Sequence, residues 1–436
     1  EVPASSDEER AHGAVKFALL VSVLPAAMLA GFVTINAAAV ANLFSVAAED
    51  RERLPQAVAL FAWALPLWTF IEVATSAARA RRAFGPEIRL RIFWEQIART
   101  LFALMFFAMG FQTLGLMAAH LASLALTALL CIPLLGRYYD LTRLVRAPVP
   151  WPLARTLLAT GLALLPANVA RRLLIDAPPV VLNLMLPGAR GAVAAGLFEI
   201  ARKISTVPLI VRQAFQYVMA PLSSAQAQVD RQEIGPLYRF ASRVSTALVV
   251  PLTGLLVFAG PDILSVYRAE AAAALPLLYV LVAARALEAI VGPATPIVEM
   301  TGHRMLPLLN SIAGAALWAL LAAWLVPAME AMGMAIAVAA ATILVAYAAT
   351  LELRISDGLT PFDSKLFRGL AIALLGLALM ALAAYLFRGP ARFASVFLFW
   401  AAASWCALRF GLIRSDREAL GSLGRRLRLV APRAAD

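Results

Sequence analysis

Long apolar runs, separated by short charged or turn-forming segments, make up most of this 436-residue chain. A bilayer core about 30 Å thick requires about 20 mainly apolar residues for each helical crossing, and the runs reach this length. The pattern therefore predicts an all-α, polytopic membrane protein with about twelve transmembrane helices. Their expected limits are residues 16–46, 55–78, 92–112, 115–136, 153–186, 192–220, 241–267, 271–300, 305–327, 331–353, 366–387 and 391–413.

The composition excludes a sizeable soluble domain. Hydrophobic residues make up 62% of the chain and charged residues 15%, whereas soluble domains have about 45–50% and about 25%. Proline is tolerated in transmembrane helices because neighbouring helices and polar side chains satisfy the freed backbone groups. We expect the fifth and eighth helices to bend at their prolines, which are Pro166, Pro178, Pro179, Pro276, Pro293 and Pro296.

The formal net charge of +12 predicts topology rather than a nucleic-acid partner, because the basic residues lie between the apolar runs and not on one soluble face. Alternate connecting segments carry most of the Lys and Arg, including the segment between helices two and three and the stretch beyond residue 408. Short cytoplasmic loops carry this excess in membrane proteins. We therefore expect both termini to be cytoplasmic and no nucleic acid to bind.

A weak internal repeat suggests two related lobes. Residues 64–67 and residues 274–277 both read Ala-Leu-Pro-Leu, six expected helices apart, and duplicated units are common in transporters. This register places the first two helices of a 14-helix pattern before residue 1. The expected plan is an N-terminal lobe of four helices at 1–150, a C-terminal lobe of six helices at 151–355, two additional helices at 356–413, and a basic cytoplasmic tail at 414–436.

Ionisable residues within the apolar runs are the candidate functional residues, because each costs about 2.5–3.5 kcal/mol at a helix centre on insertion scales. Spacings of three or four residues place several acids and bases on a common helix face. Two interpretations stay open: the pairs neutralise one another within each helix, or the surplus cations face a polar cavity. The group comprises Arg171, Arg172, Asp176, Glu199, Arg202, Lys203, Arg285 and Glu288.

Arginine binds phosphate through paired hydrogen bonds that a lysine ammonium cannot reproduce. The basic surplus therefore favours an anion-binding site over a site for cations. In the N-terminal part the further candidates are Glu72 on the second expected helix and Glu95 with Arg99 on the third. The third helix begins near the cytoplasmic surface, so we expect Glu95 and Arg99 to reach that surface.

No motif indicates catalysis or a bound metal. The histidines and the two cysteines, Cys131 and Cys406, lack the spacing of metal ligands, and no nucleophile elbow or phosphate-binding loop is present. The segments expected outside the cytoplasm are short, whereas an enzyme that builds polysaccharide in the membrane would need a larger exterior loop for its substrate. We therefore expect a protein that is not an enzyme and that has no cofactor.

The central part of the chain resembles a known family of exporters. Residues 191–204 read Gly-Ala-Val-Ala-Ala-Gly-Leu-Phe-Glu-Ile-Ala-Arg-Lys-Ile, Pro208 follows, and residues 219–224 read Met-Ala-Pro-Leu-Ser-Ser. Further along come Leu-Tyr-Arg-Phe at 237–240, Pro251, and Ile-Leu-Ser-Val-Tyr at 263–267. These motifs resemble the Wzx-type polysaccharide flippases of the multidrug/oligosaccharidyl-lipid/polysaccharide exporter superfamily, and a looser likeness covers residues 10–413.

The resemblance implies two six-helix lobes around a central cavity, in a bacterial inner membrane. Such proteins move undecaprenyl-pyrophosphate-linked oligosaccharide to the outer leaflet by alternating access, for the synthesis of surface polysaccharides such as lipopolysaccharide. It implies membrane lipids, polysaccharide polymerases and glycosyltransferases as further partners. On this chain Arg171, Arg172, Arg202, Lys203 and Arg285 would bind the pyrophosphate. The acids that would couple transport to an ion are Asp176, Glu199 and Glu288.

Three alternatives stay open at this point. The first is a drug or metabolite exporter of the same fold, although a cavity for cationic drugs should be net negative. The second is a membrane-embedded polysaccharide polymerase, ligase or glycosyltransferase, against which the short exterior segments weigh. The third is a scaffold within a polysaccharide synthesis complex, which leaves the intramembrane charges without a purpose.

Overall fold

A computed structural model describes residues 3–81, 83, 85–211, 234–300 and 305–429, and within them every regular element is helical. The expected all-α, multi-span fold is confirmed. The chain forms two compact units, Glu1–Leu165 and Pro166–Asp436, which we describe separately. Their boundary falls inside one helix, at Pro166. The lobe plan expected from the repeat, with its boundary near residue 150, stays a prediction.

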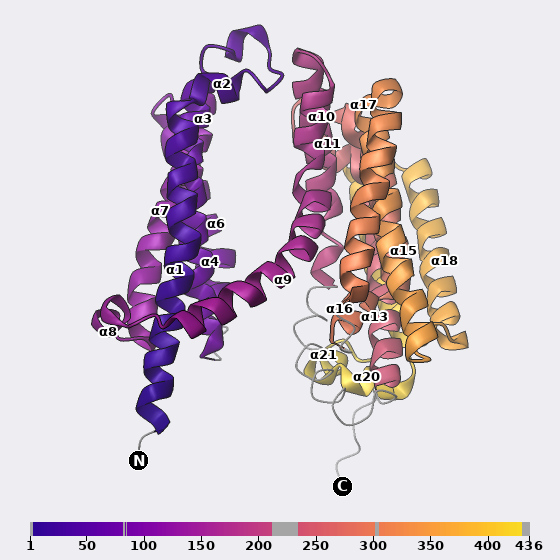
Figure 1. Cartoon of the computed structure of the whole chain (residues 1–436). Coiled ribbons are helices and arrows are strands. Elements are labelled where there is room, and N and C mark those ends of the chain that lie inside the picture. Colours follow the sequence, from indigo (N-terminus) through magenta and orange to yellow (C-terminus); the bar gives the residue numbers. More distant parts are fainter. Residues whose placement is uncertain (1–2, 82, 84, 212–233, 301–304, 430–436) are drawn as a thin grey trace. The chain divides into compact units, whose positions relative to one another are not determined.

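The N-terminal unit is a small bundle in which α4 packs between α1 and α7, and α6 packs on α7 (Figure 1). Its core contains Ile71 and Ala74 from α4 with Leu124 and Cys131 from α7, all nearly inaccessible to solvent. The small side chains of Ala74 and Cys131 let the two helices approach closely. The elements are α1 (Pro3–Ile35), α2 (Ala37–Ala41), η1 (Ala48–Asp50), α3 (Leu54–Ala62), α4 (Ala64–Ala80), α5 (Gly85–Glu87), the π-helical η2 (Ile88–Trp94), α6 (Glu95–Ala108), α7 (Gln112–Tyr138), α8 (Leu141–Arg146) and the first part of α9 (Trp151–Asp176).

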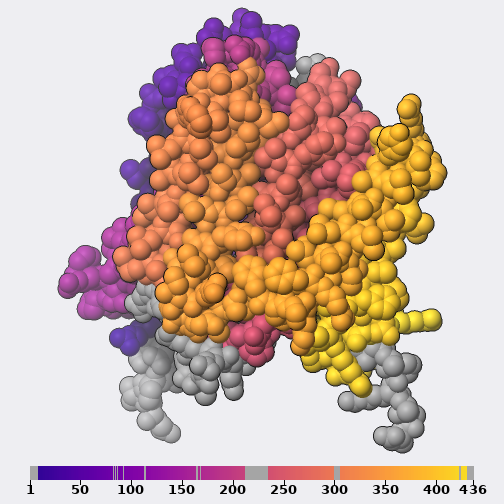
Figure 2. All heavy atoms as spheres, turned by 90° about the vertical axis from the view of Figure 1, so that its right-hand side faces the viewer, coloured from indigo at the N-terminus to yellow at the C-terminus, as the bar shows by residue number. Residues whose placement is uncertain are grey.

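The C-terminal unit contains the rest of α9 and the remaining helices. Figure 2 shows one of its faces, with α17 in orange and the last helices in yellow. The elements are α10 (Pro178–Met185), α11 (Ala189–Ser205), α13 (Ile234–Phe258), α14 (Gly260–Leu264), η4 (Ala269–Ala274), α15 (Leu275–Val291), α16 (Ala294–Met300), α17 (Met305–Ser356), α18 (Ser364–Leu386), α19 (Pro390–Cys406), the π-helical η5 (Ala407–Gly411), α20 (Arg414–Ala419) and α21 (Gly421–Arg426).

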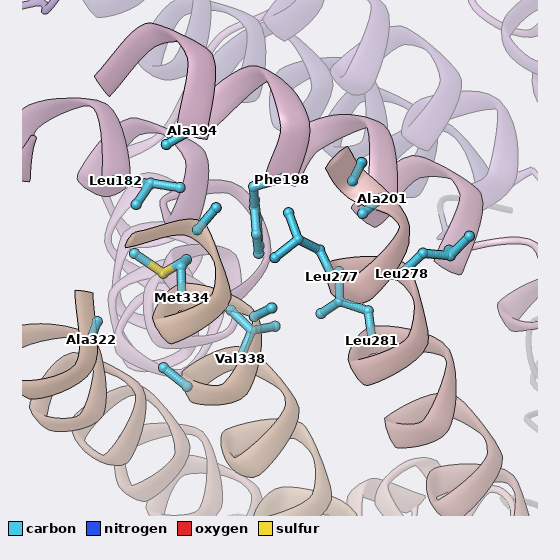
Figure 3. Packing of buried hydrophobic residues seen from close by; sticks show 14 of the residues in the cluster. Leu182, Ala194, Phe198, Ala201, Leu277, Leu278, Leu281, Ala322, Met334 and Val338 are labelled. Atoms are coloured by element: carbon cyan, nitrogen blue, oxygen red, sulfur yellow. The ribbon is translucent and has the colours of Figure 1, made fainter. Parts of the chain in front are cut away.

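The main core of the C-terminal unit lies where α10 and α11 meet α15 and α17. Phe198 of α11 is fully buried, with Leu278 of α15 and Met334 of α17 in the same cluster (Figure 3). This packing fixes the position of α11, which carries three of the candidate functional residues, Glu199, Arg202 and Lys203, in the turns next to Phe198.

The helix α17 is a hairpin of two antiparallel helices. Its backbone reverses at Glu330, which has a φ of 48° and a ψ of −125°. Across the hairpin, Asn310 donates to Glu352 at 2.7 Å, and the Trp318 indole nitrogen lies 3.3 Å from the Met334 sulfur. The two halves match the separate helices expected at 305–327 and 331–353.

Eight helices among the described residues are long and apolar enough to span a membrane, and α17 is one of these eight. The two parts of α9 on either side of Pro166 form a ninth candidate when taken as one bent span. The expected span at η2–α6 is helical but does not reach this hydropathy. The described part of the span expected at 192–220 contains most of α11, and the rest of that span, from residue 212, lies outside the described residues. The count of twelve stays a prediction.

Several helix limits differ from the expected ones. The fifth expected helix breaks at Ala177, because Pro178 and Pro179 start a new helix, α10. The eighth breaks at Gly292, where φ is 64°. The seventh begins at Ile234 rather than at 241, so the Leu-Tyr-Arg-Phe segment at 237–240 lies within the helix.

The two Ala-Leu-Pro-Leu segments have the same local structure. The first opens α4, directly after the break that ends α3 at Trp63. The second opens α15, directly after the 3-10 turn η4. Proline is favoured within the first turn of a helix, because its missing N–H has no intrahelical acceptor there. The repeated sequence therefore marks a helix start in both units.

A buried ion cluster connects α13 with two segments that come more than 100 residues later in the chain, the start of α18 and α20. The Arg243 guanidinium of α13 donates to both carboxylate oxygens of Asp416, at 2.7 and 2.9 Å, and to Asp363 at 2.6 Å. Asp363 also caps α18 by accepting from the Leu366 backbone N–H at 2.7 Å. We call Arg243, Asp363 and Asp416 the arginine clamp. It joins α13, α18 and α20 at one end of the unit (Figure 1).

Candidate functional site

The candidate site is built where the end of α9 meets α11. Pro179 has no backbone N–H, so the Ile175 carbonyl, four residues earlier, lacks its usual helical donor. Arg202 of α11 supplies a donor instead, with its Nη1 at 3.2 Å from the Ile175 oxygen. The proline break in α9 is thus what brings a basic residue of α11 against it.

Arg202 is held in a fixed orientation by Glu199, one turn earlier on α11. Its Nε and Nη2 donate to the two carboxylate oxygens at 2.7 and 2.8 Å. Lys203 lies 3.7 Å from the same carboxylate but is 68% exposed, whereas the Arg202 side chain is 16% exposed. One acid therefore faces two cations, and the second cation stays accessible.

The arginines of α9 are much more open. Arg172 pairs with Asp176 at 3.3 Å, and both side chains are more than half exposed. The neighbouring Arg171 is also exposed and donates to the Asn168 side-chain oxygen at 2.6 Å. We call Arg171, Arg172, Asp176, Glu199, Arg202 and Lys203 the α9–α11 charge group.

Arg285 and Glu288 form a second, more buried site on α15. Their side chains are 14% and 10% exposed and are joined at 2.8 Å. They line a cavity of about 20 Å³ together with residues from α13 and from the turn after α11. A cavity of this size has room for about one water molecule. This pair is therefore separated from solvent more than the α9–α11 charge group is.

The pairs expected at spacings of three and four residues all form, so each acid neutralises a base on its own helix. Five cations nevertheless accompany three acids across the two sites. An exposed charge on an apolar helix is costly in lipid. The exposed cations of the α9–α11 charge group therefore require water or an anion beside them.

Several polar contacts in the structure were not expected from the sequence. The Ile175 carbonyl, which accepts from Arg202, could have been predicted to lack its helical donor from Pro179 four residues later. The contact of Arg171 with Asn168 could have been predicted because Asn168 lies one helical turn earlier. In the N-terminal unit, Glu95 is buried rather than at the surface: it accepts from Arg99 at 2.5 Å, and Arg99 reaches Ser123 of α7. Glu72 is bound by Arg91 at 2.8 Å.

One of the motifs that carry the family resemblance, the Met-Ala-Pro-Leu-Ser-Ser segment at 219–224, lies outside the described residues. Within the part of the chain that the structure describes, no group of three or more His, Cys, Asp or Glu could hold a metal ion.

Comparisons with known proteins agree with this architecture. No protein-family model matches the chain, and neither does any curated protein. Among solved structures, the lipid II flippase MurJ in its inward closed conformation aligns with 96% of this chain and 86% of its own, with a TM-score of 0.70 and 11% identity. A MATE protein in complex with MaL6 aligns over 80% of each chain, with a TM-score of 0.58 and 14% identity. At these identities the likeness concerns the backbone: the chain has the fold shared by the MurJ flippase and the MATE proteins.

Proposed function

We propose that this protein is a flippase that moves a lipid-linked oligosaccharide from the inner to the outer leaflet of a bacterial inner membrane by alternating access. The observation that carries the proposal is the cation surplus of the α9–α11 charge group, on helices of an exporter fold. A diphosphate-linked lipid combines an anionic headgroup with an apolar tail. It therefore suits a site where arginines lie beside apolar helix surface.

The diphosphate would first bind to the accessible cations, which are Arg171, Arg172 and Lys203. The more buried Arg202 and Arg285 would bind it later in the transport cycle. Because each arginine is already paired with an acid or an amide, binding requires an exchange of partners. When the diphosphate takes the guanidinium of Arg172, Asp176 loses its cation and gains affinity for a proton or a metal cation. The exchange links anion binding to cation binding.

Glu199 and Glu288 would respond in the same way when Arg202 and Arg285 turn to the substrate. When Arg285 turns away, the buried Glu288 carboxylate loses a guanidinium, and when Arg202 turns away, Glu199 keeps only the exposed Lys203 at 3.7 Å among its basic partners. Both acids then become more costly to keep charged. Uptake of a proton or cation removes that cost. Asp176, Glu199 and Glu288 are thus the proposed coupling residues.

The distribution of basic residues supports cytoplasmic termini for this flippase. It would then collect its substrate at the face of the membrane where glycosyltransferases work, and release it to a polysaccharide polymerase on the other face. A flippase that acts between these steps would serve the synthesis of a surface polysaccharide such as lipopolysaccharide.

The test is translocation of a fluorescent undecaprenyl-pyrophosphate oligosaccharide in proteoliposomes. We expect the double variant Arg171→Gln/Arg172→Gln to slow translocation by about tenfold or more, because charge-assisted hydrogen bonds contribute about 1.5–3 kcal/mol each. Arg190→Gln is the matched control: Arg190 is an exposed cation at the start of α11 and pairs with Glu330. Unchanged translocation in the double variant would remove the proposed anion site.

The likeness to a MATE protein keeps a drug or metabolite exporter as a second candidate. That function predicts resistance to cationic compounds in cells that express the protein, and no translocation of the lipid-linked sugar. The cation surplus of the α9–α11 charge group disfavours a cationic substrate, because like charges would meet in the site.

A further inference from the structure

A second polar site lies in the N-terminal unit, at the end where α1 begins and where α4 and α7 stop. It is a hollow of about 630 Å³, within the range of about 300–1,000 Å³ typical of small-ligand sites. Three arginines line it: Arg81 directly after α4, Arg137 in the last turn of α7, and Arg143 on α8. None of these residues belongs to the proposed transport site.

The back of this hollow is rigid. Tyr139 is 4% exposed, and its hydroxyl donates to the Ala77 carbonyl at 3.1 Å. The ring of His12 packs edge-on against Tyr139 at 5.4 Å. His12 is held at both nitrogens, because Nδ1 lies 2.7 Å from the Glu8 carbonyl and Nε2 accepts from the Asp140 backbone N–H at 3.2 Å. Both ring nitrogens are therefore engaged within the wall of the hollow, which fixes the orientation of the imidazole.

The arginines outnumber the acids that are available to them. Arg81 lies over the Tyr139 ring at 4.9 Å, a contact that orients the guanidinium and adds no negative charge. Asp140 accepts through Oδ1 from the Thr142 and Arg143 backbone N–H groups at 2.8 and 3.1 Å, as the N-cap of α8, and its Oδ2 lies 3.5 Å from the Arg143 Nε in an exposed ion pair. Arg137 is exposed. With Glu8 as the other acid, the hollow keeps a positive excess.

The hollow lies beside the ends of two candidate membrane spans, and hence near the surface of the bilayer. The candidate spans of α4 and α7 end at Ala80 and Tyr138. Next to them, α8 buries Leu144 but leaves Val145 72% exposed, and Trp151 beyond it is 71% exposed. Exposed Trp and aliphatic side chains beside arginines are typical of the membrane–water interface. The ligand that is always present at this level is a lipid headgroup.

We propose that this hollow binds the phosphate of an anionic phospholipid headgroup, through the guanidinium groups of Arg81, Arg137 and Arg143. Arginine forks match the oxygens of a phosphate. The rigid wall of Tyr139 and His12 holds the hollow open in the absence of ligand, so binding needs little rearrangement. A bound lipid would link α1, α4, α7 and α8 at one membrane surface.

The test counts individual lipids bound to the full-length protein in detergent, by native mass spectrometry, with phosphatidylglycerol and phosphatidylcholine as probes. We expect phosphatidylglycerol to bind preferentially, and Arg81→Gln and Arg137→Gln each to weaken it about tenfold, as expected for the loss of a charge-assisted hydrogen bond. Arg146→Gln removes the same charge from α8 outside the hollow, and we expect it to change the affinity less than about twofold.

Two results would overturn the proposal. An equal loss in Arg137→Gln and Arg146→Gln would show attraction by surface charge alone. Displacement of phosphatidylglycerol by an equal concentration of inorganic phosphate would show that the site takes a soluble anion. Arg137 is exposed and outside the core, so its variant should keep the elution volume and melting temperature of the parent protein, which separates lost binding from misfolding.

Discussion

The C-terminal unit holds its charges in two contrasting ways. In the arginine clamp, one cation lies between two acids from distant segments, and the Arg243 and Asp416 side chains are 7% and 6% exposed. In the α9–α11 charge group, each acid pairs with a base one turn away on its own helix, and the cations are in excess. The first arrangement is buried and long-range, and the second is open and local.

This difference separates charges that hold the fold from charges that are free to act. A buried cation that already donates to two carboxylates is poorly placed to bind a further ligand, and removing it leaves two acids uncompensated. A local, exposed pair contributes little to stability, because water screens it, yet it can open without unfolding the protein. The comparison predicts opposite effects of mutation on stability and on transport.

The largest effect on stability is expected for Arg243→Ala. Breaking a buried ion cluster by removing one partner costs about 3–5 kcal/mol. The free energy of unfolding in detergent should fall by this amount, and limited proteolysis should cut the segment around α20 sooner. Arg239→Ala on the same helix is the control. A clamp variant as stable as the parent would contradict the structural role.

Arg202→Lys should lower transport strongly while it preserves the net charge. Lysine cannot make the paired hydrogen bonds to Glu199 and also reach the Ile175 carbonyl, because it lacks the planar fork. We expect at least about tenfold slower translocation, in line with the loss of a charge-assisted hydrogen bond. Parent-like transport by Arg202→Lys would mean that only charge matters at this position.

Arg172→Gln and Asp176→Asn test whether an exposed ion pair can affect transport without affecting stability. Both side chains are more than half exposed, so each substitution should change the free energy of unfolding by less than about 1 kcal/mol. Translocation should nevertheless slow in both variants, and the dependence on the coupling ion should change only in Asp176→Asn. A loss of stability as large as that of Arg243→Ala would show that this pair, too, is structural.

A small gain in stability, with no change in transport, is expected for Glu330→Gly. Glu330 has a positive φ in the turn of the α17 hairpin, a conformation that glycine adopts without strain. Relief of that strain should raise the free energy of unfolding by about 1 kcal/mol, although the exposed pair with Arg190 is lost. Glu330→Ala is the control, since it loses the pair but keeps the strain. Equal stability of the two variants would argue against strain at this turn.

The sequence was sufficient to predict the helices and the local ion pairs. Apolar runs of membrane length indicate where the chain crosses the bilayer. A spacing of three residues places Arg285 beside Glu288 on any regular helix. Both inferences need only the helical repeat. The composition alone likewise excluded a soluble domain.

The long-range contacts could not be predicted in this way. Nothing local indicates that Arg243 meets Asp363 and Asp416, because the pairing depends on how α13, α18 and α20 pack. The burial of Glu95 depends in the same way on the approach of α6 to α7. The prolines of the fifth and eighth expected helices indicated where the chain bends, but not that the helices end outright at Ala177 and Gly292, since a proline in an apolar run can either bend a helix or end it.

The arginine clamp also sets an order of events during synthesis of the chain. Asp363 and Asp416 follow Arg243 by 120 and 173 residues, and a ribosome adds about 5–20 residues per second, so Arg243 waits about 10–35 s for its last partner. During that interval α13 must be accommodated by the insertion machinery or by neighbouring helices with its guanidinium incompletely satisfied. The emergence of α20 then completes the unit, which makes the arrival of the last helices the step that commits this half of the protein to its mature form.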